Sequence, residues 1–248
     1  MKTSNKILLT ALIVIVLLII GFMIFLRANV SLESVGGSGN IVSLERETDF
    51  FTGLKFRGNM EVFLTQDSIT SLVVEADDNL HEFLKTRKEN GTLYVYLEES
   101  IGRGATMRVH VSFPELELLE ISAGVTATAS EALSGDYFKH KAQAGAKTAL
   151  NLQYSEVDMV LQAGAMATLS GNAGTMNLVS AAGVMLNARD LYINDCEIKA
   201  NAGSVNYLNV SRSLSGSVGQ GAIVYYSGNP VIEGLSTRRG GHIEAAAD

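Results

Sequence analysis

The chain has 248 residues, of which 19 are Lys or Arg and 26 are Asp or Glu, giving a formal net charge of −7. Proteins that bind nucleic acid or anionic lipid surfaces need basic patches, and this acidic balance argues against both classes of partner. The single cysteine, Cys196, cannot form an intramolecular disulfide. Its place in an apolar strand register predicts a small buried residue rather than a nucleophile.

The first element is an apolar run from Ile7 to Leu26, which follows Lys2 and Lys6. As a helix this run would be about 30 Å long, the hydrocarbon thickness of a bilayer. A secretory signal usually has a shorter apolar region and a small-residue cleavage site. The sequence therefore predicts an uncleaved signal anchor, one transmembrane helix within residues 1–27, with cleavage as the alternative. Because the lysines precede the span, we expect a cytoplasmic N-terminus and a periplasmic or extracellular C-terminal domain.

Residues 28–40 contain the run Gly36-Gly37-Ser38-Gly39 and are expected to be a flexible linker. From residue 41 to residue 113 apolar and polar residues alternate as in β-strands, but no glycine period is present. Strands are expected near residues 60–64, 72–74, 93–97 and 107–111, with a hairpin at Asn90-Gly91 and one or two helical turns after Asp77-Asp78. This segment is predicted to cap the architecture that follows.

A small residue followed by glycine recurs from Ser122 onward. The corner glycines of this repeat are expected to be Gly124, Gly145, Gly164, Gly183, Gly203, Gly221 and Gly241. Successive steps are 21, 19, 19, 20, 18 and 20 residues, and a fixed period near 20 indicates a repeat architecture. Between the corners the residues alternate as in strands: Cys196, Ile198 and Ala200 lie on one side, Glu197 and Lys199 on the other.

A unit of about 20 residues cannot bury its own apolar side, but units stacked about 4.8 Å apart share one core. The sequence therefore predicts an all-β fold, with a single-stranded, right-handed β-helix-like solenoid over residues 114–248. A sandwich or barrel of hairpins is the alternative, but hairpins do not demand the same corner dipeptide each time. A propeller fits less well, because its blades need about 40 residues.

The order of these parts resembles the auto-transporter adhesin domains of the head GIN type, which are common in the Bacteroidetes. The resemblance covers about residues 41–248. It rests on Phe50-Phe51-Thr52-Gly53-Leu54, on Val109-His110-Val111-Ser112-Phe113-Pro114-Glu115-Leu116 and on the glycine corners. It implies a β-helix-like fold and a binding role at the cell surface or envelope, and it brings no catalytic motif.

No catalytic, cofactor or metal site is predicted. A glycan lyase or hydrolase needs acids or bases gathered on neighbouring coils, whereas the outward positions of the repeats scatter their carboxylates. Lys139 beside Asp158 predicts a cross-strand ion pair. None of the four histidines has a second histidine at ligand spacing, and those in predicted strands are expected on the polar face. They are His81, His110, His140 and His242.

The outer positions of the repeats carry few charges and many asparagine, serine, threonine and glutamine residues. Such a face suits carbohydrate, and Tyr207, Tyr225 and Tyr226 could stack on a sugar ring as a ligand face. Stacked asparagines that bond to one another, and the strand preference of tyrosine, explain the same residues structurally.

The sequence thus predicts a membrane-anchored, non-enzymatic cell-envelope protein whose β-helical ectodomain binds a glycan, a partner protein or another copy of itself. Self-association is expected through edge strands near residues 242–246. The alternatives are a β-helix glycan-acting enzyme, which clustered acids in a groove would favour, and an envelope sensor or scaffold subunit.

Overall fold

The computed structural model of the protein describes residues 3–29 and 34–246. It divides into an N-terminal unit that ends at Ser34 and a β unit that begins at Val35. The N-terminal unit contains the helix α1 (Thr3–Asn29). Within the described residues, no helix combines the length and the apolar character needed to cross a membrane, so the predicted transmembrane helix is not found there.

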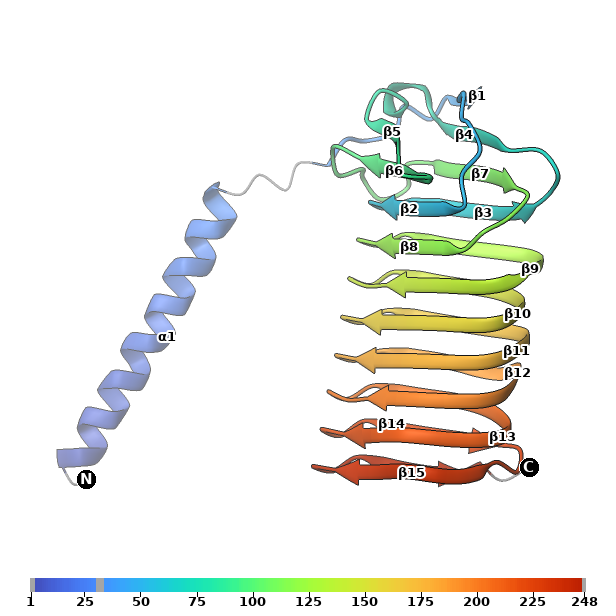
Figure 1. The fold of residues 1–248 in the computed structure, drawn as a ribbon. Coiled ribbons are helices and arrows are strands. Elements are labelled where there is room, and N and C mark those ends of the chain that lie inside the picture. The colour runs from blue at the N-terminus through green and yellow to red at the C-terminus, as the bar shows by residue number, and fades with distance from the viewer. Residues whose placement is uncertain (1–2, 30–33, 247–248) are drawn as a thin grey trace. The chain divides into compact units, whose positions relative to one another are not determined.

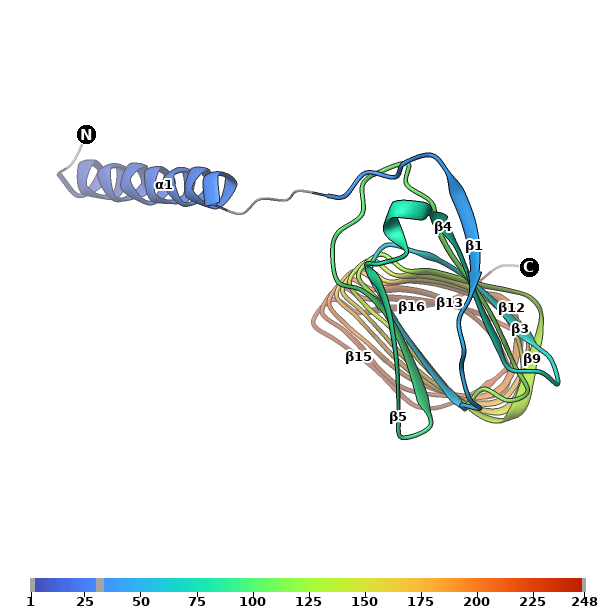
Figure 2. The ribbon, with the colours of Figure 1, turned by 90° about the horizontal axis from the view of Figure 1, so that it is seen from above.

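The β unit is a solenoid of about seven turns whose coils stack into a column (Figure 1). One 16-stranded sheet winds around the column and forms two walls, which lie on opposite sides when the column is viewed along its axis (Figure 2). Five long strands run along both walls: β9 (Thr126–Ala142), β10 (Lys147–Gln162), β11 (Met166–Ala181), β12 (Met185–Ala200) and β13 (Val205–Gly219).

We call the two walls the first wall and the second wall. The first wall holds the first parts of the long strands together with β1 (Ile41–Glu45), β4 (Ser71–Asp77), β7 (Met107–Phe113), β3 (Glu61–Gln66), β14 (Ile223–Ser227) and β16 (His242–Ala245). The second wall holds their last parts together with β5 (Leu84–Glu89), β6 (Thr92–Leu97), β2 (Gly53–Arg57), β8 (Leu118–Ser122) and β15 (Val231–Arg238). A 3-10 helix, η1 (Asp78–Leu80), stands where the sequence predicts helical turns.

Parallel stacking of coils begins before residue 114, within the segment that was predicted only to cap the repeat. On the second wall β2 pairs in parallel with both β6 and β8, and on the first wall β3 pairs in parallel with both β7 and β9. These early coils lack the alanine-glycine corner, and β4 and β5 interrupt their chain order. Among the described strands, the antiparallel pairs are β1 with β4, β4 with β7 and β5 with β6, and β1, β4 and β5 close the N-terminal end of the column.

Residues 35–40, part of the predicted flexible linker, are bound to this end of the column, while residues 30–33 lie outside the described part of the chain. The amide of Val35 donates to the carbonyl of Ser100 at 2.9 Å, and the amide of Gly39 donates to the Asp77 carboxylate at 2.6 Å. The side chains of Ser38 and Asn40 donate to Asp78. The carboxylates of Asp77 and Asp78, where β4 meets η1, thus bind a segment that its glycine content predicts to be flexible.

The corners are tight turns in which two consecutive residues have positive φ. At Ala144 and Gly145 φ is 53° and 72°, and the amide of Ala146 donates to the carbonyl of Gln143 at 3.3 Å. A Cβ at Gly145 would meet nothing within 4 Å, so glycine is favoured there by its backbone freedom and not by crowding. The amide of Gly145 also donates to the carbonyl of Ala163 in the next coil at 3.1 Å, which links successive corners.

Six of the seven predicted corner glycines occupy this second turn position, from Gly124 to Gly221. At the last corner the pair is Arg239 and Gly240, with φ of 48° and 78°, so the prediction of Gly241 is wrong by one residue. Gly241 follows the turn, and a Cβ there would lie 2.2 Å from the carbonyl oxygen of Val218. Two adjacent glycines made the two roles indistinguishable in the sequence.

Side chains fill the column as rows that run from coil to coil. Phe138, Val157, Met176, Cys196 and Leu214 are register partners on successive coils, and all are buried. Burial of Cys196 confirms its predicted place in the core, and that burial raises the pKa of its thiol to about 12.

Candidate ligand-binding groove

A groove of about 560 Å³ lies on the outer side of the second wall, where the β5–β6 hairpin extends the wall beyond β2. Figure 2 shows this hairpin projecting from the outline of the column. The groove spans β5, β6, β2, β8, β9 and β10, and its volume lies within the range of ligand pockets, roughly 300–1,000 Å³. Two rows of outward side chains cross it.

The first of these, which we call the Glu120 row, consists of Tyr94, Lys55, Glu120, Lys141 and Val160, which are register partners on neighbouring strands. Glu120 accepts hydrogen bonds from Lys141 Nζ at 2.7 Å and from Lys55 Nζ at 3.0 Å. Burial acts to raise the pKa of Glu120, but the hydrogen bonds from the two lysines outweigh it and lower the pKa below its usual value. The hydrogen bond to Glu120 raises the pKa of Lys55.

The Tyr94 ring at the end of this row is in contact with two cationic side chains. Lys55 Nζ lies 5.2 Å from the ring centroid, and Arg87 Cζ lies 4.9 Å from it. Both distances fall within the range of cation–π contacts. The charged and aromatic groups of the Glu120 row therefore satisfy one another, and the row serves mainly to hold the strands in register.

The second row, which we call the Arg57 row, consists of Tyr96, Arg57, Ser122, Gln143 and Gln162. Arg57 pairs in register with Tyr96 on one side and with Ser122 on the other. The guanidinium of Arg57 has no ion pair or side-chain hydrogen bond with any described residue, and the same is true of the side chains of Ser122, Gln143 and Gln162. At the strand spacing of about 4.8 Å this row is roughly 19 Å long.

The groove is positively charged in an acidic chain. Its lining contains four cationic side chains, Lys55, Arg57, Arg87 and Lys141, and one carboxylate, Glu120, for a formal charge of +3. The chain as a whole carries −7. Because the pKa of Glu120 is depressed, this carboxylate stays ionised at neutral pH. Arg87 is paired at 3.3 Å with Glu89, which lies outside the lining, so Arg57 is the lining cation that has no ionic partner among the described residues.

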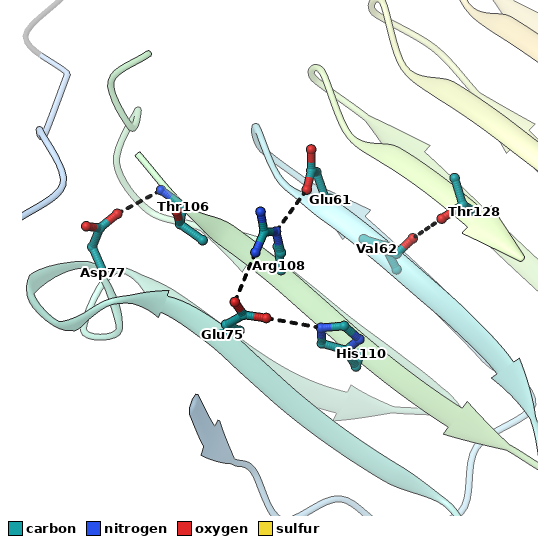
Figure 3. Close-up of polar contacts among 8 residues, drawn as sticks. All are labelled: Glu61, Val62, Glu75, Asp77, Thr106, Arg108, His110 and Thr128. Carbon is teal, nitrogen blue, oxygen red and sulfur yellow. Dashed lines mark hydrogen bonds and ion pairs between the residues drawn. The ribbon is translucent and has the colours of Figure 1, made fainter. Parts of the chain in front are cut away.

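The outer side of the first wall carries a polar cluster of a different kind at the same end of the column (Figure 3). Arg108 lies between two carboxylates, at 3.2 Å from Glu61 and 3.0 Å from Glu75. His110 Nε2 lies 3.6 Å from Glu75, and its ring stacks on Phe63 with centroids 4.8 Å apart. Every charged side chain in this cluster has an ionic partner on a neighbouring strand, so the cluster links the strands of the first wall.

The predicted tyrosine face is divided between the outside and the inside of the column. Tyr207 and Tyr225 are register partners on the first wall, and their rings stack with centroids 5.0 Å apart. Arg189 lies over the Tyr207 ring at 3.6 Å. Tyr226 points to the opposite side of β14 and packs against the core, so it does not belong to this face.

Other expected positions also differ from the prediction. His140 is fully buried rather than exposed, and its Nδ1–H donates to the carbonyl of Leu119 at 3.0 Å. Asp158 pairs in register with Lys139 but forms no ion pair with it; instead Asp158 accepts hydrogen bonds from Tyr137 and Asn177. Within residues 3–29 and 34–246, no group of three or more His, Cys, Asp or Glu side chains is placed to hold a metal ion.

The groove residues are not among the predicted site residues: those before residue 114 lie in the predicted cap, and the others lie in the predicted repeat. Lys55 and Lys141 are 86 positions apart, and they meet only because β2 stacks on β8 and β8 on β9. A local signal does exist, since Lys55 and Arg57 alternate with buried Leu54 and Phe56 and therefore face outward. The alternation shows which side of the strand a residue faces, but it does not show which strand lies next to it.

Comparison with known proteins finds a family match for this chain. The family profile described as "Putative auto-transporter adhesin, head GIN domain" matches residues 50–230. No match was found among curated proteins.

Several solved structures share the fold at low sequence identity. A putative adhesin from Bacteroides fragilis NCTC 9343 is 17% identical with a TM-score of 0.81, and the match covers 86% of this chain and 100% of that one. A putative lipid binding protein from Parabacteroides distasonis ATCC 8503 is 17% identical with a TM-score of 0.69, covering 87% and 100%. A putative adhesin from Parabacteroides merdae ATCC 43184 is 16% identical with a TM-score of 0.63, covering 87% and 100%. At these identities the likeness establishes the fold alone.

Proposed function

Because the chain belongs to the family of putative auto-transporter adhesins with a head GIN domain, we propose that it is an exported, non-enzymatic adhesin that holds a glycan on the outer side of its second wall. The observation that carries the proposal is the Arg57 row, a line of unpartnered polar side chains beside an aromatic ring in a groove of ligand size. Export would place this groove where it meets ligands outside the cell.

The chemistry of the row supports a glycan. Sugar hydroxyl groups both donate and accept hydrogen bonds, and the Gln143 and Gln162 amides and the Ser122 hydroxyl can complement them in either role. Tyr96 offers an aromatic face to the apolar side of a sugar ring. A rigid wall also holds these groups in place before the ligand arrives, which lowers the entropic cost of binding.

The one carboxylate in the groove supports binding over hydrolysis. Glycoside hydrolysis uses a pair of carboxyl groups, one of which carries a raised pKa so that it can act as an acid. Glu120 has the opposite character, because two lysines lower its pKa and occupy its oxygens. Its arrangement suits a fixed structural charge.

The proposal is tested with the purified full-length chain on an array that contains neutral and acidic glycans, with lipid vesicles as a separate arm. We expect saturable binding to at least one glycan. Absence of saturable binding across the whole array, or binding to vesicles alone, would overturn the glycan adhesin. The vesicle arm is included because one protein of the same fold is described as lipid binding.

A further inference from the structure

The positive charge of the groove restricts the chemical class of the ligand. We propose that the groove selects acidic glycans, with the Arg57 guanidinium pairing with a sugar carboxylate while Tyr96 packs against the ring. This inference rests on the proposed function and adds the chemical class of the ligand. Lys55 and Lys141 are held by Glu120, and Arg87 is held by Glu89. Arg57, by contrast, has no ionic partner among the described residues.

Arginine is the cation best suited to this task. Its guanidinium presents two parallel N–H groups that match the two oxygens of a carboxylate, and it stays charged at every physiological pH. Arg57 is exposed and lies directly between Tyr96 and Ser122 in the strand register. A carboxylate placed on Arg57 would therefore bring the rest of the sugar against an aromatic ring on one side and a hydroxyl on the other.

The positive field of the groove assists this selection. The lining carries a formal charge of +3, so the rest of the chain carries −10 (−7 minus +3), and several cations elsewhere on the column are paired with carboxylates. Arg212, for example, is bound by Asp195, and Arg108 lies between Glu61 and Glu75. An anionic ligand is thus attracted to the groove and repelled by most of the remaining surface.

Two other anionic partners fit the groove less well. An acidic peptide often binds by adding a strand to a free sheet edge, but β6, β2, β8, β9 and β10 are each paired on both sides. β5 has no second partner among the described strands, and it contributes only Arg87 to the lining, at the end of the groove away from β8. A lipid would need an apolar surface for its chains, and Val160 is the one aliphatic side chain that the two outward rows place in the groove. Amides and a hydroxyl occupy the corresponding positions of the Arg57 row.

The test uses matched pairs of glycans that differ in one group. The full-length chain is titrated against glycans with uronic or sialic acid and against the methyl ester of each. Because the ester keeps the sugar and removes the charge, we expect the acidic member of at least one pair to bind about 10- to 100-fold more tightly. Equal binding of the acid and its ester would overturn the inference while leaving the glycan adhesin intact.

Variants then locate the carboxylate. Arg57→Gln should weaken binding of the acidic glycan about 10- to 100-fold and leave the methyl ester unaffected. Arg57→Lys should restore part of the loss, because it keeps the charge but not the two-pronged geometry. Arg212→Gln is the matched control, since it removes the same charge from an exposed site outside the groove.

Three further results would contradict the inference. They are an unchanged affinity in Arg57→Gln, an equal loss in Arg212→Gln, and an equally tight, Arg57-dependent binding of poly-glutamate or phosphatidylglycerol vesicles. Failure of every glycan to bind would overturn both the inference and the glycan adhesin. Circular dichroism of each variant verifies the fold, which these exposed substitutions should leave intact.

Discussion

The two walls of the column each carry an outward arginine close to the N-terminal end, and the two arginines are used differently. On the first wall Arg108 is bound by Glu61 and Glu75 (Figure 3). On the second wall Arg57 has no partner among the described residues. Both lie on neighbouring coils of one sheet. The difference indicates that a charge in this fold stabilises the column where it is paired and is available to a ligand where it is not.

The histidines of the two walls also differ, because they lie on opposite sides of the sheet. His110 lies outward on the first wall beside Glu75, whereas His140 lies inward on the second wall, one residue before Lys141 of the groove. His140 is fully buried beside Phe138, and it forms no ion pair with a carboxylate of the described residues. The second wall therefore combines a positive outer surface with an ionisable group in its core.

Between pH 6.5 and about pH 4, acid should destabilise the folded protein through this buried group. Burial lowers the pKa of His140 from about 6.5 to about 4, although the hydrogen bond to Leu119 opposes the shift. Between these values the unfolded chain binds a proton that the folded chain excludes, so stability falls as the pH falls. The expected loss is up to about 3 kcal/mol from pH 6.5 to pH 4, and it is constant below that window.

Chemical denaturation of His140→Met at several pH values measures this effect. Methionine is apolar and matches Met159, its neighbour in the same row on the next coil, so the variant should remain folded and lose the pH dependence attributed to His140. His110→Leu, on the outer side of the first wall, is the control and should keep it. Identical pH profiles for the wild type and His140→Met would contradict the assignment.

Aromatic side chains on the two walls give the next comparison. Tyr96 flanks Arg57 and its ring stacks on no other ring of the described residues, whereas Tyr225 stacks on Tyr207 on the first wall. We expect Tyr96→Ala to weaken glycan binding about 10-fold and Tyr225→Ala to leave it unchanged. Array binding of the two variants decides between the walls. If only Tyr225→Ala loses binding, the ligand lies on the first wall and the groove has another role.

Removing the carboxylate of the groove should increase affinity. In Glu120→Gln the groove gains one unit of positive charge, and Lys55 and Lys141 become available to the ligand. The expected change is about 3- to 5-fold tighter binding of the acidic glycan at physiological salt, with little change for its methyl ester. Weaker binding in this titration would mean that Glu120 itself contacts the ligand, and the two rows would then act as one site.

The repeat itself is readable from the sequence because its cause is local. A turn with two consecutive positive φ values favours glycine, and this demand recurs at each corner from Gly124 to Gly221. The coil of β2 and β3 and the coil of β6 and β7 make the same kind of wall without that turn, so no period marks them. Their inclusion in the column follows from strand pairing that the alternation of residues does not encode.

Two other glycines, which lie outside the corners, could not be singled out from the sequence either. A Cβ at Gly171 would lie 2.1 Å from the carbonyl oxygen of Leu152, and one at Gly216 would lie 2.0 Å from that of Ile198. These contacts arise between neighbouring coils, so the spacing along the chain gives no sign of them. The groove shares this property: its residues are readable one by one as outward positions, but their meeting depends on the stacking of coils.

The smallest effect expected from the comparison of the walls is that of Arg108→Gln. The pairs of Arg108 with Glu61 and Glu75 are largely exposed, and exposed ion pairs contribute little because solvent screens them. The melting temperature should fall by about 1 °C, and the difference from the wild type should disappear at about 1 M salt. Glycan affinity should stay unchanged, because the substituted side chain faces away from the groove. An affinity loss as large as that of Arg57→Gln would contradict the distinction between paired and free arginines, since it would show that a fully partnered charge on the opposite wall also takes part in binding.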